Sequence, residues 1–148
     1  MYSAVEKARR RRGFTLVELL VVIVVLAVLA AIVLPKFMNS SKRSKESALR
    51  SDLKILRNAV GLFQTDTLAY PKQLSDLAAT APPPKGLDKD GNEVAIIPGD
   101  WHGPYLQDAP NDPIGGAAFT YSVAAGSVGK VTSSTAGNGL DGTAYSNW

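Results

Sequence analysis

The sequence contains no cysteine and a single histidine, His102. Without cysteine, neither a disulfide framework nor a thiolate metal site can form, so irregular loops must be held by packing, hydrogen bonds or an oxygen-ligated ion. One histidine alone does not suggest a zinc site or a histidine-dependent catalytic triad. The chain also has no internal repeat, Gly-rich phosphate loop, acid–base pair or nucleophile–base set. These absences predict that the protein is not an enzyme.

Positive charge is concentrated at the N-terminus. The net charge is +3 and the pI is about 9.2, a balance that can indicate a nucleic-acid partner. However, the first twelve residues hold Lys7 and a run of four arginines against only Glu6, a formal charge of about +4. The rest of the chain is therefore close to −1, and we expect no nucleic-acid partner.

A long apolar run follows this basic segment. Residues 14–34 are almost wholly apolar, and no polar residue occurs between Leu19 and Leu34. As a helix this run would be about 32 Å long, which matches the roughly 30 Å hydrocarbon core of a bilayer. Its many Val and Ile residues favour a strand in water, but a lone strand cannot satisfy its backbone in lipid. We predict one membrane-spanning helix with its N-terminus in the cytoplasm, because the basic residues precede it.

Pro35 follows the apolar run. Proline removes one backbone hydrogen bond and clashes with the preceding turn, so we expect it to kink, loosen or interrupt the helix. Helical periodicity then resumes over about 36–66. There, apolar residues recur with spacings of 4, 3, 4 and 3, at Leu49, Leu53, Leu56, Val60 and Phe63. This stripe predicts an amphipathic helix that packs on the C-terminal region.

Residues 67–148 are predicted to form a globular head. Tyr70 and Pro71 end the helical pattern, because proline disfavours helix at the preceding residue. The expected elements are a short helix at 73–79 and strands at 94–97, 118–124 and 128–133, the last two joined through Gly126 and Ser127. The predicted fold class is therefore α+β, a long N-terminal helix whose outer half packs on a small antiparallel β-sheet.

Several residues between these elements are expected to have structural roles. Asp108, Asp112 and Pro113 should organise turns before the sheet. Trp101 and Tyr105 should anchor the core rather than stack on a ligand.

One carboxylate, Glu18, lies inside the apolar run. An ionisable group in a membrane segment is costly unless it has a partner, and the run offers no cation nearby. Cleavage after Gly13 would free the α-amine of Phe14, and Glu18 of one copy could then pair with the Phe14 amine of a neighbour. This interpretation predicts self-assembly. The alternatives are a plain signal anchor in which Glu18 is incidental, or a secretory signal peptide cut near Ala30.

These residues resemble the N-terminus of the type IV pilin superfamily, whose precursors carry a basic leader, a glycine, FTLVE or a close variant, and a long apolar helix. Residues 13–18 read GFTLVE, and Pro35 lies where the family commonly has a proline. The resemblance implies a pilin-like ladle with a leader at 1–13, a transmembrane assembly helix at 14–35 and an amphipathic helix at 36–66. It also implies that a prepilin peptidase cuts between Gly13 and Phe14, that the Phe14 amine is methylated, and that Glu18, Phe14 and Pro35 serve assembly.

The C-terminal region resembles one branch of this superfamily, the major pseudopilins of type II secretion systems. The shared features are YP at 70–71, WxGPYL at 101–106, PxDP at 110–113 and a final Asn-Trp. The resemblance implies the major subunit of a periplasmic pseudopilus that drives protein secretion. The alternative is a pilin of a type IV or competence pilus, for adhesion, motility or DNA uptake. Implied partners are further copies of the chain, minor pseudopilins, the peptidase, and an assembly ATPase and platform at the inner membrane.

Major pseudopilins hold their C-terminal loop with calcium, which the resemblance makes a candidate cofactor here. Calcium needs six to eight oxygen ligands. The C-terminal loop of this chain, residues 133–146, offers Asp141, Asn138, hydroxyl groups and carbonyls, but one carboxylate where the family usually has more. Asp141 and Asn138 are the candidate ligands. The alternative is a Gly-rich turn in which Asp141 caps its own backbone.

Overall fold

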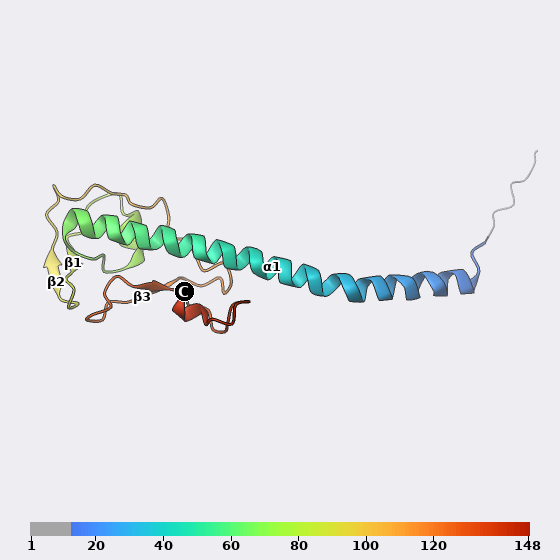
Figure 1. The fold of residues 1–148 in the computed structure, drawn as a ribbon. Helices are drawn as coiled ribbons and strands as arrows, with labels where there is room; N and C mark the ends of the chain where they lie inside the picture. Colours follow the sequence, from blue (N-terminus) through green and yellow to red (C-terminus); the bar gives the residue numbers. More distant parts are fainter. Residues whose placement is uncertain (1–12) are drawn as a thin grey trace, which may run out of the picture. The chain divides into compact units, whose positions relative to one another are not determined.

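A computed structural model describes residues 13–148. The predicted leader, 1–13, lies outside the described residues except for Gly13. The structure divides into two compact units, Met1–Ser40 and Ser41–Trp148, which are described separately below. The boundary falls within helix α1, Leu16–Thr67. Figure 1 labels this helix.

Helix α1 is continuous through Pro35. Of the three effects expected of this proline, an interruption is therefore wrong, and the two predicted helices are one helix. Proline removes a single backbone donor, while both flanking sequences are long and favour helix, so the loss of one bond does not end it. The helix begins at Leu16 rather than Phe14 and ends at Thr67 rather than at residue 66.

The part of α1 in the first unit is apolar and exposed. Every residue from Gly13 to Phe37 is exposed, including all the large apolar side chains between Leu16 and Leu34. This segment is long and apolar enough to cross a membrane. A helix that is apolar on all sides suits lipid or a bundle of similar helices, as predicted.

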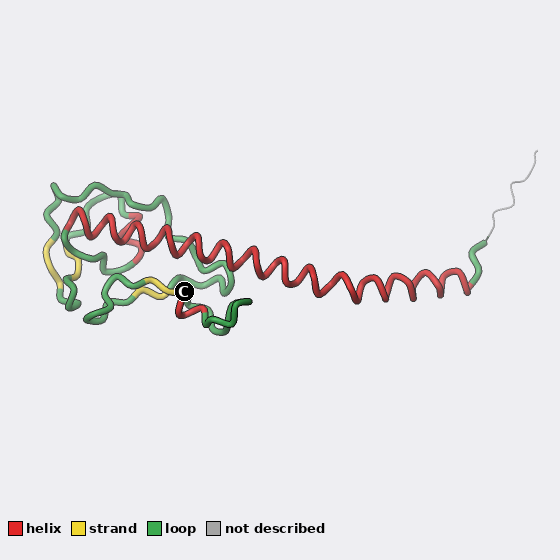
Figure 2. Tube along the Cα trace, viewed as in Figure 1, coloured by secondary structure: helices red, strands yellow, loops and turns green. Residues whose placement is uncertain are grey.

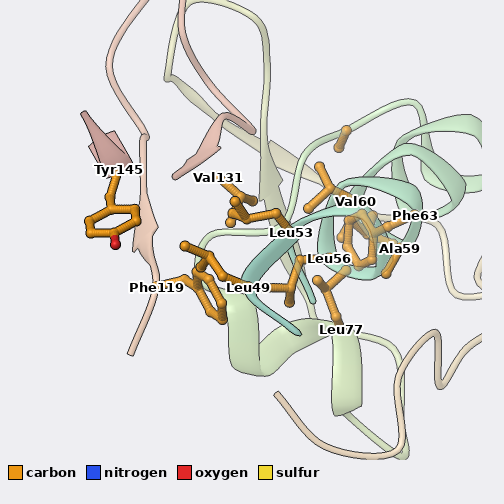
Figure 3. Close-up of a cluster of buried hydrophobic side chains, with 12 residues drawn as sticks. Leu49, Leu53, Leu56, Ala59, Val60, Phe63, Leu77, Phe119, Val131 and Tyr145 are labelled. Carbon is orange, nitrogen blue, oxygen red and sulfur yellow. The ribbon is translucent and has the colours of Figure 1, made fainter. Parts of the chain in front are cut away.

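The part of α1 in the second unit carries the core. The five residues of the predicted stripe, Leu49 to Phe63, are each no more than 4% exposed. They form one cluster with buried apolar side chains from the rest of the unit, which include Leu77, Phe119, Val131 and Tyr145 (Figure 3). Ile96 also belongs to this cluster. The amphipathic helix is thus confirmed, and the hydrophobic effect attaches the C-terminal region to it.

Two small antiparallel sheets complete the α+β fold. β1 (Lys85–Leu87) pairs with β2 (Glu93–Ala95), and β3 (Thr120–Tyr121) pairs with β4 (Val131–Thr132). The 3₁₀ helix η1 (Leu74–Ala78) follows α1 in the chain, and a second one, η2 (Tyr145–Asn147), lies at the C-terminus. Figure 2 shows that loops and turns connect these short elements.

The predicted strands exist but differ in extent. The expected strand 94–97 is Glu93–Ala95, and β1 was not predicted, because its three residues lie between a proline run and a turn. The expected pair 118–124 and 128–133 forms only the two-residue strands β3 and β4. Its turn needs glycine, since Gly126 and Gly129 have φ of 75° and 84°, and a Cβ at Gly129 would lie 2.5 Å from the Tyr70 ring.

Candidate functional site

The predicted cleavage bond lies just before α1. Gly13, Phe14 and Thr15 are exposed and outside the helix, and the Phe14 residue is 78% exposed. A Cβ built at Gly13 would meet no atom within 4 Å. The 13–14 peptide bond therefore lies in accessible backbone, the state that proteolysis requires.

Thr15 and Glu18 form a capping box at the start of α1. The Glu18 N–H donates to Thr15 Oγ1 (3.2 Å), while the Thr15 N–H and hydroxyl donate to Glu18 Oε2 (2.8 and 2.9 Å). This pairing satisfies backbone donors that have no partner within the helix. Sequence reasoning missed it, although the Thr-x-x-Glu spacing before an apolar run is its signal.

The capping box uses only one oxygen of the Glu18 carboxylate. Both Thr15 donors reach Oε2, and no described residue donates to Oε1 or forms a salt bridge with Glu18. A carboxylate has about four acceptor positions, so Oε1 keeps capacity for a further donor. Pro35 lies about 26 Å further along α1, at 1.5 Å per residue, and is not part of this local arrangement.

The C-terminal loop places Asp141 in a self-capped turn. The Thr143 N–H donates to Asp141 Oδ1 (2.9 Å), and the backbone closes between Gly139 and Thr143. Arg50 Nη2 lies 2.7 Å from Asp141 Oδ2. The Thr143 N–H, and then the Arg50 guanidinium, hold the pKa of Asp141 below its ordinary value. The alternative expected for Asp141, capping of its own backbone, is therefore present.

The candidate ligand oxygens of the C-terminal loop do not fit a calcium site. The Asn138 main-chain carbonyl accepts from Lys42 Nζ (3.1 Å), and the Asp141 carboxylate is paired with Arg50. Within residues 13–148, no group of three or more acidic, histidine or cysteine side chains is arranged to hold a metal. The two predicted ligands instead face cationic side chains of α1, which would repel a divalent ion.

Glu46 of α1 is buried and accepts hydrogen bonds from the C-terminal loop. It is only 8% exposed, and its Oε1 accepts from the Leu140 N–H (2.9 Å) and the Tyr145 hydroxyl (3.0 Å). Burial, and then the hydrogen bond to Glu46, raise the pKa of Tyr145. The i, i+4 spacing of Glu46 and Arg50 favours an ion pair between them on the helix, but Arg50 pairs with Asp141 instead. The contacts of Glu46 with the C-terminal loop were not predicted.

Asp112 is a fully buried carboxylate that connects two distant segments. Its Oδ1 accepts the Ile114 and Gly115 N–H groups (2.8 and 3.3 Å), as expected of a turn. Its Oδ2 also accepts the hydroxyls of Ser133 and Thr135, about twenty residues later. Burial would raise the pKa of Asp112, but these hydrogen bonds outweigh it and lower the pKa. The turn role was predicted; the link to residues 133–135 was not.

The two aromatic residues predicted to anchor the core are partly buried against it. The Tyr105 ring lies 5.5 Å from that of Phe63 and 6.2 Å from that of Trp101, both edge-on. The Tyr105 hydroxyl donates to Asp66 (2.8 Å). These contacts confirm the expected structural role.

Comparison with known proteins covers both units. Residues 8–34 match the prokaryotic N-terminal methylation motif, and residues 36–146 match type II secretion system (T2SS), protein G. The type II secretion system core protein G of Pseudomonas aeruginosa is 34% identical over 108 residues, 69% of this chain and 76% of the relative. The proteins of the same name from Aeromonas hydrophila and Vibrio cholerae are 35% and 30% identical, covering 76% and 77% of those relatives. No solved structure gave a significant match.

These matches agree with the resemblance carried by the N-terminal GFTLVE and by the motifs of the globular unit. The protein G match alone spans about three quarters of the chain. The chain therefore belongs to the protein G family of type II secretion systems, the major pseudopilins of the type IV pilin superfamily.

Proposed function

We propose that this chain is the precursor of the major structural subunit of a type II secretion pseudopilus, and that it is not an enzyme. The apolar part of α1 anchors the precursor in the inner membrane with its N-terminus in the cytoplasm. A prepilin peptidase cuts between Gly13 and Phe14, and the new Phe14 amine is methylated. The observation that carries the proposal is the capped carboxylate Glu18 at the start of the exposed apolar part of α1.

The capping box and the intermolecular pair are compatible. Thr15 occupies Glu18 Oε2, which leaves Oε1 to accept the Phe14 ammonium of a neighbouring subunit. The cap also holds the carboxylate in one rotamer, so less side-chain entropy is lost when the pair forms. In the low dielectric of a helix bundle, such a pair favours one stagger between neighbours over others.

Assembly would exchange lipid for protein around α1. Its exposed apolar residues lie on all sides, so each helix can pack against several others. An interface between different surfaces of identical subunits, repeated without closure, generates a helical filament. Extraction from the membrane needs energy, which we assign to an assembly ATPase acting through a membrane platform, with minor pseudopilins as further partners.

Secretion is favoured over a surface pilus. The match to protein G extends through the globular unit, the part in which secretion and adhesion subunits would differ. We therefore place the filament in the periplasm, with roles in adhesion, motility or DNA uptake as the alternative. No nucleic-acid partner is expected.

The first test identifies the mature N-terminus. Sequencing of the protein recovered from membranes of cells that contain the peptidase should begin at N-methylated Phe14. Gly13→Val should leave the precursor uncut, with Gly61→Val, a change to an exposed helical glycine, as the control for general effects on expression. A mature protein beginning at Met1, or normal processing of Gly13→Val, would contradict the proposal.

The second test separates secretion from a pilus. Deletion of the gene in its own host should abolish release of exoproteins and leave surface filaments and twitching unchanged. The wild-type gene should restore release, whereas Gly13→Val should not. Loss of surface filaments with intact secretion would favour the alternative.

A further inference from the structure

We propose that basic side chains of α1 hold the C-terminal loop in the place of a divalent cation, so that this pseudopilin folds the loop without calcium. Lys42, Arg50 and Arg57 are the three side chains, which we call the basic clamp. Their spacings of eight and seven residues place them near one face of the helix. All three reach residues near the C-terminus.

Arg50 is the centre of the basic clamp. Its guanidinium carbon lies 3.9 Å from the centre of the Trp148 ring, and its Nη2 lies 2.7 Å from Asp141. One planar cation thus makes a cation–π contact and an ion pair at once, which lysine cannot reproduce with the same geometry. Trp148 also packs edge-on against Tyr145 (5.1 Å), so the contact connects the loop to the core.

Arg57 and Lys42 bind main-chain oxygens on either side of Arg50. Arg57 donates to the Val131 carbonyl through Nε (3.2 Å) and Nη2 (2.8 Å), and Nη2 also donates to the Trp148 main-chain oxygen. Lys42 Nζ donates to the Asn138 carbonyl (3.1 Å). Carbonyl and carboxylate oxygens are the ligands that calcium uses. Here they accept hydrogen bonds from side chains that already carry positive charge.

The basic clamp and a bound divalent cation exclude one another. An ion at Asp141 would lie within a few ångströms of the Arg50 guanidinium and would compete with it for the Asp141 carboxylate. The nearby carboxylate of Glu46 is buried, and its Oε1 accepts hydrogen bonds from the Leu140 N–H and the Tyr145 hydroxyl. The positive charges that hold the oxygen atoms of the C-terminal loop therefore come from side chains of the protein rather than from a metal ion.

The basic clamp faces solvent, which sets the size of the effect. The Arg50 and Asp141 side chains are 60% and 44% exposed, beside a cavity of about 360 Å³ that Arg57 and Trp148 also line. Exposed ion pairs are weak and are screened by salt. The loss of Arg50 should therefore lower the melting temperature of the globular unit by about 3 °C, rather than unfold it.

The experiment uses the full chain in detergent, with unfolding followed by tryptophan fluorescence. Millimolar calcium or excess EGTA should move the melting temperature of the wild type by less than about 1 °C. Arg50→Gln should lower it by about 3 °C, and the matched control Lys54→Gln, which removes an exposed charge one turn away, should not. In about 1 M salt the difference between Arg50→Gln and the wild type should shrink, because the ion pair is screened.

Two further measurements decide the outcome. Terbium titrated into the wild type should give no saturable luminescence sensitised by Trp148, and Asp141→Asn should resemble Arg50→Gln in melting temperature. Stabilisation of the wild type by calcium, or terbium binding that Asp141→Asn abolishes, would overturn the proposal in favour of a metal. Equal melting temperatures for Arg50→Gln and Lys54→Gln would overturn the role of the basic clamp. Neither result bears on filament assembly, so the proposed function is tested separately.

Discussion

The two parts of α1 share one continuous helix but differ in where their partners lie. From Leu16 to Phe37 the large apolar side chains are exposed, whereas the stripe from Leu49 to Phe63 is buried. Both sequences favour helix and both are rich in apolar residues. The difference is that the partners of the second part lie within this chain, whereas lipid or other copies must cover the first. Exposure of a long apolar segment in a single chain therefore marks a surface that contacts lipid or another molecule.

The carboxylates of the two parts follow the same division. Glu46 and Asp112 have their donors inside the globular unit, at Leu140, Tyr145, Ser133 and Thr135. Glu18 has only Thr15, three residues away, and no cation among residues 13–148. The two buried carboxylates of the globular unit thus have their donors within that unit, whereas the Glu18 carboxylate has an acceptor position left for a donor from another molecule.

The largest expected effect comes from removing the charge of Glu18 while keeping its cap. Glutamine can also serve in a capping box, so Glu18→Gln should preserve helix α1 and membrane insertion. It cannot pair with an ammonium as a carboxylate does, so filament yield should fall at least about tenfold. Yield is measured by shearing filaments from cells that overproduce the secretion machinery, with insertion checked by membrane fractionation.

The reciprocal variant separates the cap from the charge. Thr15→Val loses the capping hydroxyl but keeps the Glu18 carboxylate, so its filament yield should fall much less than that of Glu18→Gln. Wild-type yield from Glu18→Gln would mean that the cap alone accounts for Glu18. In that case the charge of Glu18 would not need a partner from another molecule.

The second prediction tests whether the core of α1 is confined to the globular unit. Leu56→Ala removes a fully buried side chain and should lower the free energy of unfolding by about 3 kcal/mol, measured by urea denaturation in detergent. Leu62 lies on the same helix but is 57% exposed, so Leu62→Ala should change the free energy of unfolding by less than about 0.5 kcal/mol. Equal losses would show that Leu62 is also covered in the single chain.

The elements that depend on periodicity or a local motif were predictable from the sequence. The membrane helix, the buried stripe and the family follow from the apolar run, the 3–4 spacing and GFTLVE, because each signal lies within a few neighbouring residues. β1 was not predictable, since three residues with a central glycine carry no strand pattern. The roles of Arg50 and Asp112 depend on partners 91 and 21 to 23 residues away, which no local pattern specifies.

The third prediction concerns a polar contact that is complete within the globular unit. Asp112→Asn replaces an acceptor of two hydroxyls and two N–H groups with an amide that can accept at only one atom. We expect a loss of about 2 kcal/mol in the free energy of unfolding. Asp108→Asn is the matched control, because Asp108 is exposed and accepts from the adjacent Ala109 N–H. An equal loss of unfolding free energy in both variants would mean that the buried hydrogen bonds of Asp112 stabilise the unit no more than the exposed one of Asp108.

The pH dependence gives Asp112 a second readout. Its pKa is lowered in the folded state, so its contribution is fully present above the unfolded value of about 3.9 and is lost as the pH falls through the folded value. The difference in melting temperature between the wild type and Asp112→Asn should therefore be constant from about pH 5 to 7 and shrink below about pH 4. A difference that grows on acidification would contradict the assignment.

The smallest expected effect belongs to an exposed ion pair network at the β1–β2 sheet. Glu93 pairs with Lys72 and with Lys85 (2.7 Å), and the hydrogen bond from Lys72, followed by that from Lys85, lowers its pKa to about 2. Because all three side chains are at least 43% exposed, solvent weakens the attraction despite the large pKa shift.

Glu93→Gln should therefore lower the melting temperature by no more than about 2 °C, and the difference should vanish in about 1 M salt. Since the pKa is lowered, the contribution is present above about pH 4.3 and is lost as the pH falls towards 2. Asp90→Asn is the control, because the Asp90 carboxylate pairs with its sequence neighbour Lys89. A loss as large as that of Asp112→Asn would mean that exposed charges, and not burial, decide which contacts stabilise this unit.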